Sequence, residues 1–318
     1  MSPIRLRLNE VATRDGFQME SRFIPTADKI AFVDRLSGLG YARIEVTSFT
    51  SPAAIPALAD AEAVMKGIRR APEVVYTALV PNVRGAHRAL ECRTDEFNLV
   101  MSASETHNLA NLRMTREQSF AQLAQVVRLA GEAGVPVNVS LSTAFGCPME
   151  GEVDPGEVLG WIGRFAALGA AGITLCDTTG MAYPTQVRQL CEAAIGAFPT
   201  LSFTAHFHDT RRMGLANAMV AAEAGIRTFD ASLGGLGGCP YAPGATGNVA
   251  TEDLAHMFQC LGYDTGVDLE GLVEAARRLV PLVGHPLSSQ LPLAGPRLTR
   301  HPPPPGFTEI KSRALARG

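Results

Sequence analysis

The chain has 318 residues, of which 46% are hydrophobic and 19% are charged, and its formal net charge is −3. This is an ordinary globular composition, and without a basic excess a nucleic-acid partner is not expected. No apolar run approaches the roughly 18 residues that a membrane span requires, so no membrane partner is expected either. The first strand-like run begins at residue 4, and the six cysteines lack CxxC spacing. These features predict a cytoplasmic protein with free thiols and no targeting peptide.

Eight short apolar runs alternate with helical patterns along the chain. The predicted strands are residues 4–11, 42–47, 74–80, 97–101, 136–141, 172–175, 201–207 and 228–233. The predicted helices are residues 27–39, 60–70, 84–91, 116–133, 155–168, 184–198, 213–224, 248–261 and 269–283. Such alternation indicates a parallel sheet, and eight units fit a (β/α)8 TIM barrel better than an unusually wide doubly wound sheet.

The predicted barrel domain covers residues 1–285, including one additional helix after the eighth unit. The following extension, residues 286–318, contains four consecutive prolines at 302–305 and ends in a short basic segment. Proline supplies no backbone N–H donor, so this extension is expected to be loosely ordered.

Polar side chains gather at the carboxyl ends of the predicted strands, where barrels of this type carry their chemistry. They are Arg14, Asp15, Glu45, Asp177, His206, His208, Cys239 and Asn248. Arg14 and Asp15 belong to the segment TRDGFQME, whose Arg-Asp-Gly sequence is also common in plain surface turns. The segment alone therefore does not distinguish a catalytic site from a surface turn.

The tripeptide in HFHDT places His206 and His208 on one face of a strand, because alternate residues of a strand point the same way. Taken alone, it is more often a pair of core histidines than a metal site. With Asp15 and Asn248 on the same rim, a divalent metal site becomes the favoured interpretation. A nitrogen and oxygen ligand set without thiolate suits Mg²⁺ or Mn²⁺.

The glycine-rich segment 232–248 surrounds Cys239 with six glycines and two prolines. A free cysteine is usually a small apolar filler. Here the flanking glycines favour an exposed thiol on a flap that closes over a substrate and transfers a proton. A covalent nucleophile is the other alternative, although no histidine base neighbours the thiol in the sequence.

Eight segments of the chain form a recognisable series: EVATRDGFQME, IEVTSFTSP, SASE, FGCPMEG, CDTTG, HFHDT, ANA and GGLGGCPYAPGATGNVATEDL. Together they resemble the 3-hydroxy-3-methylglutaryl-CoA lyase family of metal-dependent lyases and condensing enzymes. They occur in order between about residue 4 and residue 285. The Arg-Asp and histidine motifs are shared with condensing relatives such as isopropylmalate synthases, whereas the glycine-cysteine loop is specific to the lyase branch.

The resemblance implies a role for each rim residue. Asp15, His206, His208 and Asn248 would bind the metal, with His206 also taking part in catalysis. Arg14 would bind the substrate and stabilise the enolate of acetyl-CoA, with Gln18 lining the site. Cys239 would transfer a proton, and Glu45 and Asp177 would shape the surrounding acidic network. The substrate would be an acyl-CoA, and the protein a homodimer.

Four residues depart from the family's usual pattern: Met19, Ser21, Met149 and Cys176. These departures leave the acyl group open between 3-hydroxy-3-methylglutaryl-CoA, citramalyl-CoA and a longer-branched analogue. A condensing synthase is disfavoured because most of those relatives carry a further C-terminal domain. A non-catalytic metal- or ligand-binding barrel is the alternative from another class, but none of the expected metal ligands is lost.

Overall fold

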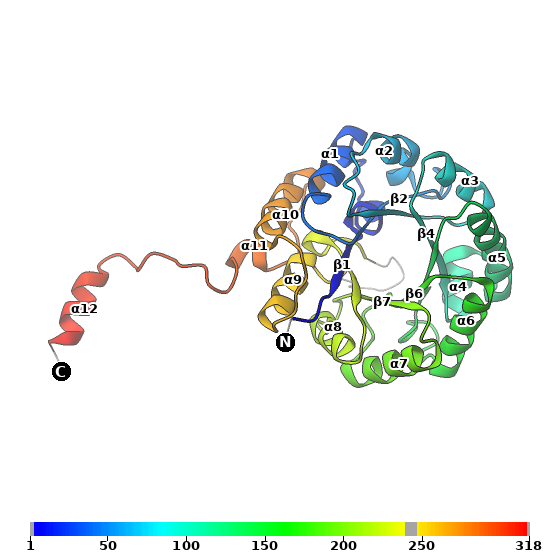
Figure 1. The fold of residues 1–318 in the computed structure, drawn as a ribbon. Helices are drawn as coiled ribbons and strands as arrows, with labels where there is room; N and C mark the ends of the chain where they lie inside the picture. Colours follow the sequence, from blue (N-terminus) through cyan, green and yellow to red (C-terminus); the bar gives the residue numbers. More distant parts are fainter. Residues whose placement is uncertain (1–2, 239–246, 317–318) are drawn as a thin grey trace.

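The eight strands close into a barrel in chain order (Figure 1). The computed structural model describes residues 3–238 and 247–316. The strands are β1 (Arg7–Glu10), β2 (Arg43–Ser48), β3 (Val75–Leu79), β4 (Glu96–Ser102), β5 (Val137–Ser142), β6 (Gly172–Asp177), β7 (Ser202–Phe207) and β8 (Thr228–Ala231). Neighbouring strands are parallel, and Arg7 lies opposite Thr228 where β1 pairs with β8. The predicted (β/α)8 barrel is confirmed.

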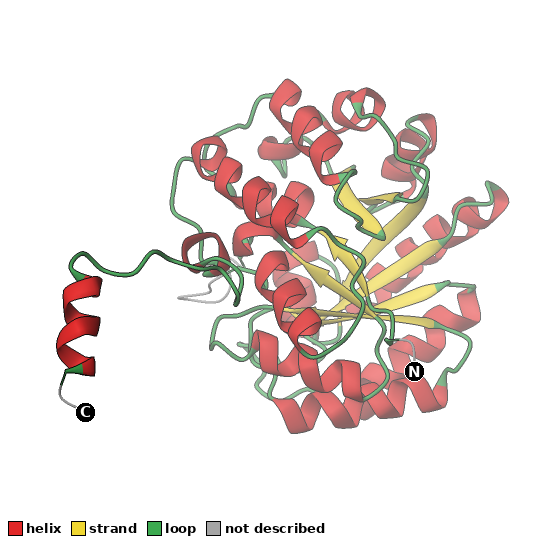
Figure 2. Ribbon diagram, turned by 60° about the vertical axis from the view of Figure 1, so that its left-hand side comes forward, coloured by secondary structure: helices red, strands yellow, loops and turns green. Residues whose placement is uncertain are grey.

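Helices surround the barrel on its outer face (Figures 1 and 2). The described helices are α1 (Thr26–Leu36), α2 (Ala61–Gly67), α3 (Val83–Glu91), α4 (Glu105–Leu112), α5 (Arg116–Glu132), α6 (Pro155–Leu168), α7 (Pro184–Ala197), α8 (Gly214–Glu223), α9 (Thr251–Cys260), α10 (Leu269–Val283), α11 (Leu291–Ala294) and α12 (Phe307–Leu315), of which α12 lies apart from the barrel. Among the described helices, none is long and apolar enough to cross a membrane.

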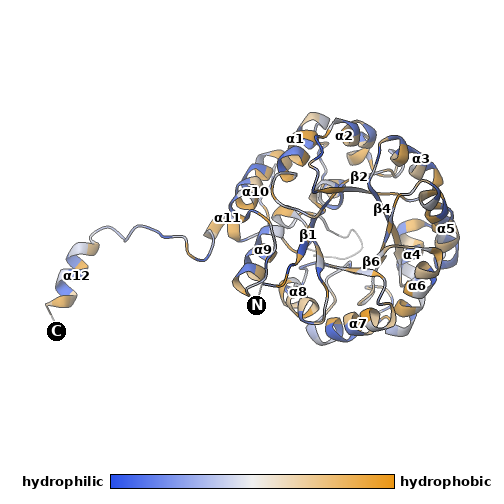
Figure 3. Ribbon diagram, viewed as in Figure 1, coloured by the Kyte–Doolittle hydropathy of each residue, from blue (hydrophilic) through white to orange (hydrophobic). Residues whose placement is uncertain are grey.

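The core lies between the sheet and the helices. All six residues of β6 are buried, as expected for a strand covered on both faces. Along the outer helices hydrophobic and hydrophilic residues alternate (Figure 3), which is typical of amphipathic helices with one face toward a sheet. α10 is the additional helix after the eighth unit, and it buries Leu272, Ala276 and Leu279 against the barrel.

Two of the differences from the predicted element bounds lie beside the predicted site. β1 ends at Glu10 because a π-helical turn, Ala12–Gly16, follows: the carbonyl of Val11 accepts hydrogen bonds from the backbone N–H groups of Arg14 and Asp15. α9 begins at Thr251 rather than at residue 248, because Asn248 instead forms an isolated antiparallel bridge with His208. Both changes occur where the chain passes the predicted site.

The sequence analysis missed α4. Its two buried residues, His107 and Asn108, are polar, so the helix shows no apolar stripe. It ends at Arg113, whose φ of 57° and ψ of 30° lie in the left-handed region. This helix contacts β4.

The C-terminal extension contains two further helices. α11 contacts α10 and buries Leu291. α12 follows the prolines and stands clear of the barrel (Figure 1), with no buried residue along its length.

Candidate active site and metal centre

The turn after β1 directs Arg14 and Asp15 into the barrel mouth. All five residues of the turn Ala12–Gly16 are buried. Gly16 is required there by close approach, since a Cβ at this position would lie 2.9 Å from the Cβ of Leu236 in the loop after β8. The first and last strands therefore meet at the site.

Arg14 is held between two carboxylates. Its Nε donates to Oε2 of Glu45 at 2.6 Å, and its Nη1 donates to Oδ1 of Asp15 at 2.6 Å. Glu45 is held in turn by Nδ2 of Asn98, which donates to its Oε1 at 2.8 Å. Burial disfavours the charge, but Glu45 and Asp15 raise the pKa of Arg14, so the guanidinium stays protonated. The result is a fixed cation at the barrel mouth.

Three side chains offer ligand atoms to one point. Asp15, His206 and His208 are buried, and one ligand atom from each lies within 4.8 Å of the others. The two imidazole rings, at the end of β7, are 5.3 Å apart between centroids. The structure thus brings together the three residues that the sequence predicted on two distant strands, and it forms a candidate metal site.

Asn248 completes the same cluster. Its Nδ2 donates to Oδ2 of Asp15 and to the carbonyl of Leu236, both at 2.8 Å. Its Oδ1 is buried and finds no hydrogen-bond partner in the described part of the chain, and neither does Nδ1 of His208. An unsatisfied buried polar atom costs about 1–3 kcal/mol. These atoms, with the carboxylate of Asp15, fit a divalent cation bound by nitrogen and oxygen.

The protonation states suit this donor set. Burial disfavours the charged form of Asp15, but the neighbouring guanidinium of Arg14 and the ring of His206 keep its pKa below the usual value. Burial, together with the charge of His206, lowers the pKa of His208 to about 4, so its imidazole is neutral near pH 7. A neutral imidazole has a free lone pair for a metal.

Asp230, in β8, is a site residue that the sequence analysis missed. Its Oδ2 lies 3.4 Å from Nδ1 of His206, and its Oδ1 accepts from Nδ2 of Asn9 at 2.8 Å. Although burial opposes protonation, Asp230 raises the pKa of His206. The sequence offered no local signal for it, since only the register of β7 against β8 places Asp230 beside His206. A carboxylate on one ring nitrogen fixes the tautomer and orientation of a ligating histidine.

Asp177 lies at the end of β6 but does not line the cavity. Its Oδ1 accepts hydrogen bonds from the backbone N–H groups of Met181 and Ala182, at 2.7 and 3.1 Å. Burial raises its pKa to about 6. In this structure the side chain holds the turn after β6 in place. Gln18, by contrast, lines the cavity and donates to Oδ1 of Asp15 at 3.2 Å.

The stems of the glycine-rich loop are tied to the barrel by two buried carboxylates. Oε1 of Glu10 accepts from the N–H of Leu233 at 2.9 Å, and Glu252 accepts from the N–H of Gly234 at 3.1 Å. Gly237 has a φ of 90°, and a Cβ there would lie 2.6 Å from Nδ2 of Asn248. This glycine is needed because the backbone passes directly over the metal cluster. Cys239 lies outside the described residues.

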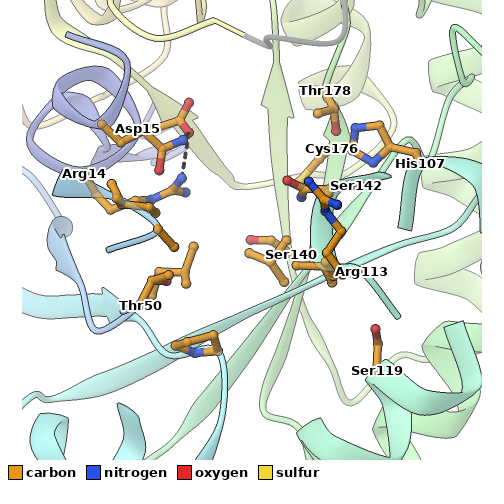
Figure 4. A pocket seen from close by; sticks show the side chains of 18 of the residues that line it. Arg14, Asp15, Thr50, His107, Arg113, Ser119, Ser140, Ser142, Cys176 and Thr178 are labelled. Carbon is orange, nitrogen blue, oxygen red and sulfur yellow. Dashed lines mark hydrogen bonds and ion pairs between the residues drawn. The ribbon is translucent and has the colours of Figure 1, made fainter. Parts of the chain in front are cut away.

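A cavity of about 680 Å³ opens above this cluster. One wall, which we call the metal wall, carries Arg14, Asp15, Gln18, His206 and His208. Across from it, the α4–α5 wall carries Asn111, Leu112, Arg113, Met114, Ser119, Gln122 and Leu123, and Ser140 and Ser142 of β5 adjoin it. Figure 4 shows Arg14 and Asp15 on one side, and Arg113, Ser140, Ser142 and His107 on the other.

The four departures from the family pattern fall in different places. Cys176 is buried and lines the cavity, where its Sγ contacts the carbonyl of Thr174 at 3.6 Å. Met19 also lines the cavity. Met149 and Ser21 are exposed and do not line it. Two of the four can therefore influence which acyl group fits.

Several known proteins have similar sequences and structures. A hydroxymethylglutaryl-CoA lyase of Bacillus subtilis is 44% identical over 288 residues, covering 91% of this chain and 96% of that protein. An (R)-citramalyl-CoA lyase of Chloroflexus aurantiacus is 39% identical over 297 residues, covering 90% and 94%. The structure of an HMG-CoA lyase from Acinetobacter baumannii, in complex with coenzyme A and 3-methylmalate, superimposes with a TM-score of 0.90 at 46% identity, covering 94% and 98%.

The match extends through the whole barrel. The HMGL-like family model covers residues 5–280, from the strand that precedes Arg14 to the additional helix α10. This range contains the candidate metal ligands and the cavity above them. The chain therefore belongs to the HMGL-like family.

Proposed function

We propose that the protein is a metal-dependent carbon–carbon lyase that cleaves 3-hydroxy-3-methylglutaryl-CoA into acetyl-CoA and acetoacetate. The observation that carries this proposal is that a nitrogen and oxygen ligand set and a clamped guanidinium face one cavity. A retro-Claisen cleavage needs both, because a hydroxyl must lose its proton while a thioester oxygen gains negative charge. The names of the relatives support the substrate.

Asp15, His206, His208 and Asn248 would hold the metal, for which Mg²⁺ or Mn²⁺ is the expected ion. When bound, it acts as a Lewis acid that lowers the pKa of the substrate hydroxyl. Asp230 would keep the ring of His206 in one orientation by accepting the proton on Nδ1.

The reaction breaks the bond between C2 and C3 of the acyl chain. The O–H electrons become the new carbonyl of acetoacetate, and the C2–C3 pair becomes the enolate of acetyl-CoA. Arg14 would donate to the enolate oxygen, and since Glu45 and Asp15 already hold the guanidinium, little reorganisation is needed. Glu45 thus acts by positioning Arg14.

Two proton transfers complete the reaction: one from the hydroxyl, and one to C2 of the enolate. In the first, His206 would act as a metal ligand whose Nδ1–H is held by Asp230, and the carboxylate of Asp15 beside the metal would accept the hydroxyl proton. Cys239 is assigned to the second, in keeping with its glycine-rich surroundings. Gln18 would contact the substrate from the metal wall. Asp177 would contribute indirectly, by fixing the turn after β6.

A second candidate is a lyase for citramalyl-CoA or for a longer-branched analogue of the same thioester. Cys176 and Met19 favour it, since both line the cavity and both depart from the family pattern. The 39% identity to a citramalyl-CoA lyase supports the same alternative.

The test is acetyl-CoA release from 3-hydroxy-3-methylglutaryl-CoA and, separately, from citramalyl-CoA, with Mg²⁺ or Mn²⁺ added. EDTA removes the metal and Cys239→Ala removes the thiol, and each should abolish release. Cys260→Ala, which removes an exposed thiol of α9, is the matched control. Release that needs both the metal and Cys239 supports the proposal. Metal binding without cleavage of either thioester would contradict it and favour a non-catalytic binding barrel.

We further propose a cytoplasmic homodimer that acts in leucine degradation and ketone-body formation, on the strength of the family resemblance. α10, whose Val280 is partly exposed, is the proposed contact between subunits. Light scattering coupled to size-exclusion chromatography distinguishes a dimer from a monomer.

A further inference from the structure

Arg113 is the unusual residue of the α4–α5 wall. It ends α4 with φ 57° and ψ 30°, a left-handed conformation that glycine and asparagine adopt readily but other residues adopt at a cost. A costly backbone conformation that persists at a ligand cavity points to a role for the side chain. Arg113 lines the cavity and is drawn across from Arg14 and Asp15 (Figure 4).

The charge of Arg113 is unpaired within the described part of the chain. The other charged groups on the cavity surface are Arg14 and Asp15, which pair with each other, and Arg14 also pairs with Glu45. No described residue forms an ion pair or a side-chain hydrogen bond with Arg113. The hydroxyl of Ser142, on the neighbouring strand, likewise forms no hydrogen bond with the described residues. The α4–α5 wall and the adjoining end of β5 therefore present a guanidinium and a hydroxyl to an anion.

We propose that Arg113 binds the free carboxylate of the acyl chain and so selects 3-hydroxyacyl thioesters of dicarboxylic acids. The inference rests on the proposed function, which places the hydroxyl and the thioester carbonyl of the substrate at the metal wall. The one charged group of such an acyl chain is its free carboxylate. A guanidinium recognises a carboxylate by two parallel hydrogen bonds, which gives orientation as well as affinity.

The phosphates of coenzyme A are the other source of negative charge. They are separated from the thioester by the whole pantetheine arm. Arg113 instead shares a cavity of about 680 Å³ with Arg14 and the histidines, where the thioester itself would lie. This geometry favours the acyl carboxylate as the partner of Arg113, and free coenzyme A tests the alternative.

The experiment compares two unreactive ligands, glutaryl-CoA and pentanoyl-CoA, by titration calorimetry with Mg²⁺ present. They have the same chain length and differ in a terminal carboxylate or methyl group, and neither carries the hydroxyl that cleavage needs. The variants are Arg113→Met and Arg113→Asn, the second because asparagine accepts a positive φ and keeps the fold intact. Arg84→Met is the matched control, since Arg84 is exposed on α3 and does not line the cavity.

We expect both Arg113 variants to bind glutaryl-CoA about 10- to 100-fold more weakly, because a charged hydrogen-bonded pair is lost. Pentanoyl-CoA, free coenzyme A and every ligand of Arg84→Met should keep their wild-type affinity, and Arg113→Lys should recover part of the loss. With 3-hydroxy-3-methylglutaryl-CoA, KM should rise more than kcat falls. Arg113→Asn should also raise Tm.

Two results would overturn the inference: glutaryl-CoA binding that is indifferent to Arg113, or equal losses for all three ligands, which would assign Arg113 to the phosphates. The binding assay is independent of turnover. If 3-hydroxy-3-methylglutaryl-CoA is not cleaved but the glutaryl preference depends on Arg113, the proposed function fails and the inference survives. If 3-hydroxy-3-methylglutaryl-CoA is cleaved but Arg113 has no effect on the glutaryl preference, the proposed function survives and the inference fails.

Discussion

The metal wall and the α4–α5 wall of the cavity are built in opposite ways. On the metal wall, Arg14 is held by two carboxylates, and Asp15 is held by Arg14, Gln18 and Asn248. On the α4–α5 wall, Arg113 forms no side-chain contact of this kind with the described residues. Catalytic groups benefit from being fixed before the substrate arrives. A group that distinguishes one acyl chain from another can obtain its partner from the substrate. The comparison suggests that reaction type is determined on one wall and acyl specificity on the other.

The largest loss of metal affinity and activity should come from substituting Asp15 on the metal wall. Asp15→Asn removes the one carboxylate of the ligand set, and it also removes a partner of Arg14. We expect Mn²⁺ affinity, measured by calorimetry, to fall more than about a hundredfold, since even outer contacts of a metal ligand are worth 10–100-fold. Activity should disappear. Normal Mn²⁺ affinity in this variant would rule out the assigned metal site.

A smaller effect is expected from Arg14→Gln, which removes the fixed cation and leaves the metal ligands in place. We expect kcat to fall about 10²- to 10³-fold, because an oxyanion donor is lost, while Mn²⁺ still binds. Steady-state kinetics and Mn²⁺ titration on the same preparation separate the two properties. A change in KM without a change in kcat would mean that Arg14 binds the substrate and plays no part in the chemical step.

A substitution at Gly237 tests whether the backbone that crosses the metal wall must lie close to the metal ligands. In Gly237→Ala the new Cβ would approach Nδ2 of Asn248 at 2.6 Å and Oδ2 of Asp15 at 3.0 Å, at a φ of 90°. We expect Mn²⁺ affinity to fall about tenfold, because both ligands must move. Gly131→Ala in α5, where a Cβ would meet nothing within 4 Å, is the control and should bind Mn²⁺ normally. Equal affinities would show that the loop adapts.

The smallest effect on activity should come from Glu252, which anchors the loop stem through Gly234. Burial raises the pKa of Glu252 from 4.5 to about 8. Because the folded-state pKa is the higher one, stability from this group is fully present below pH 4.5 and is lost as the pH rises toward 8. The free energy of unfolding should fall by up to about 1.4 kcal/mol per pH unit in that window. Chemical denaturation at several pH values should show this slope, and Glu252→Gln should flatten it.

Much of the architecture could be predicted because it depends on local patterns. The alternation of apolar strands with helical periodicity predicted the barrel, and the barrel implied that Asp15, His206, His208 and Asn248 share a rim. α4 could not be predicted, because its buried side chains are polar. Asp230 was missed because its contact with His206 depends on the register of β7 against β8. Asp177 was expected to shape the acidic network around the metal, and in the structure its carboxylate holds a turn and does not line the cavity.

By itself, the sequence determined the fold class and the residue types of the metal site, since hydrophobic periodicity and ligand chemistry are both properties of the chain. The tertiary structure alone decided how the charges are paired. Arg14 faces two carboxylates, whereas Arg113 faces the cavity with no carboxylate partner among the described residues. Pairing depends on distances of a few ångströms between residues far apart in the chain, and those distances are set by strand register and by where each turn ends. That is why two arginines that look alike in the sequence have such different surroundings in the folded protein.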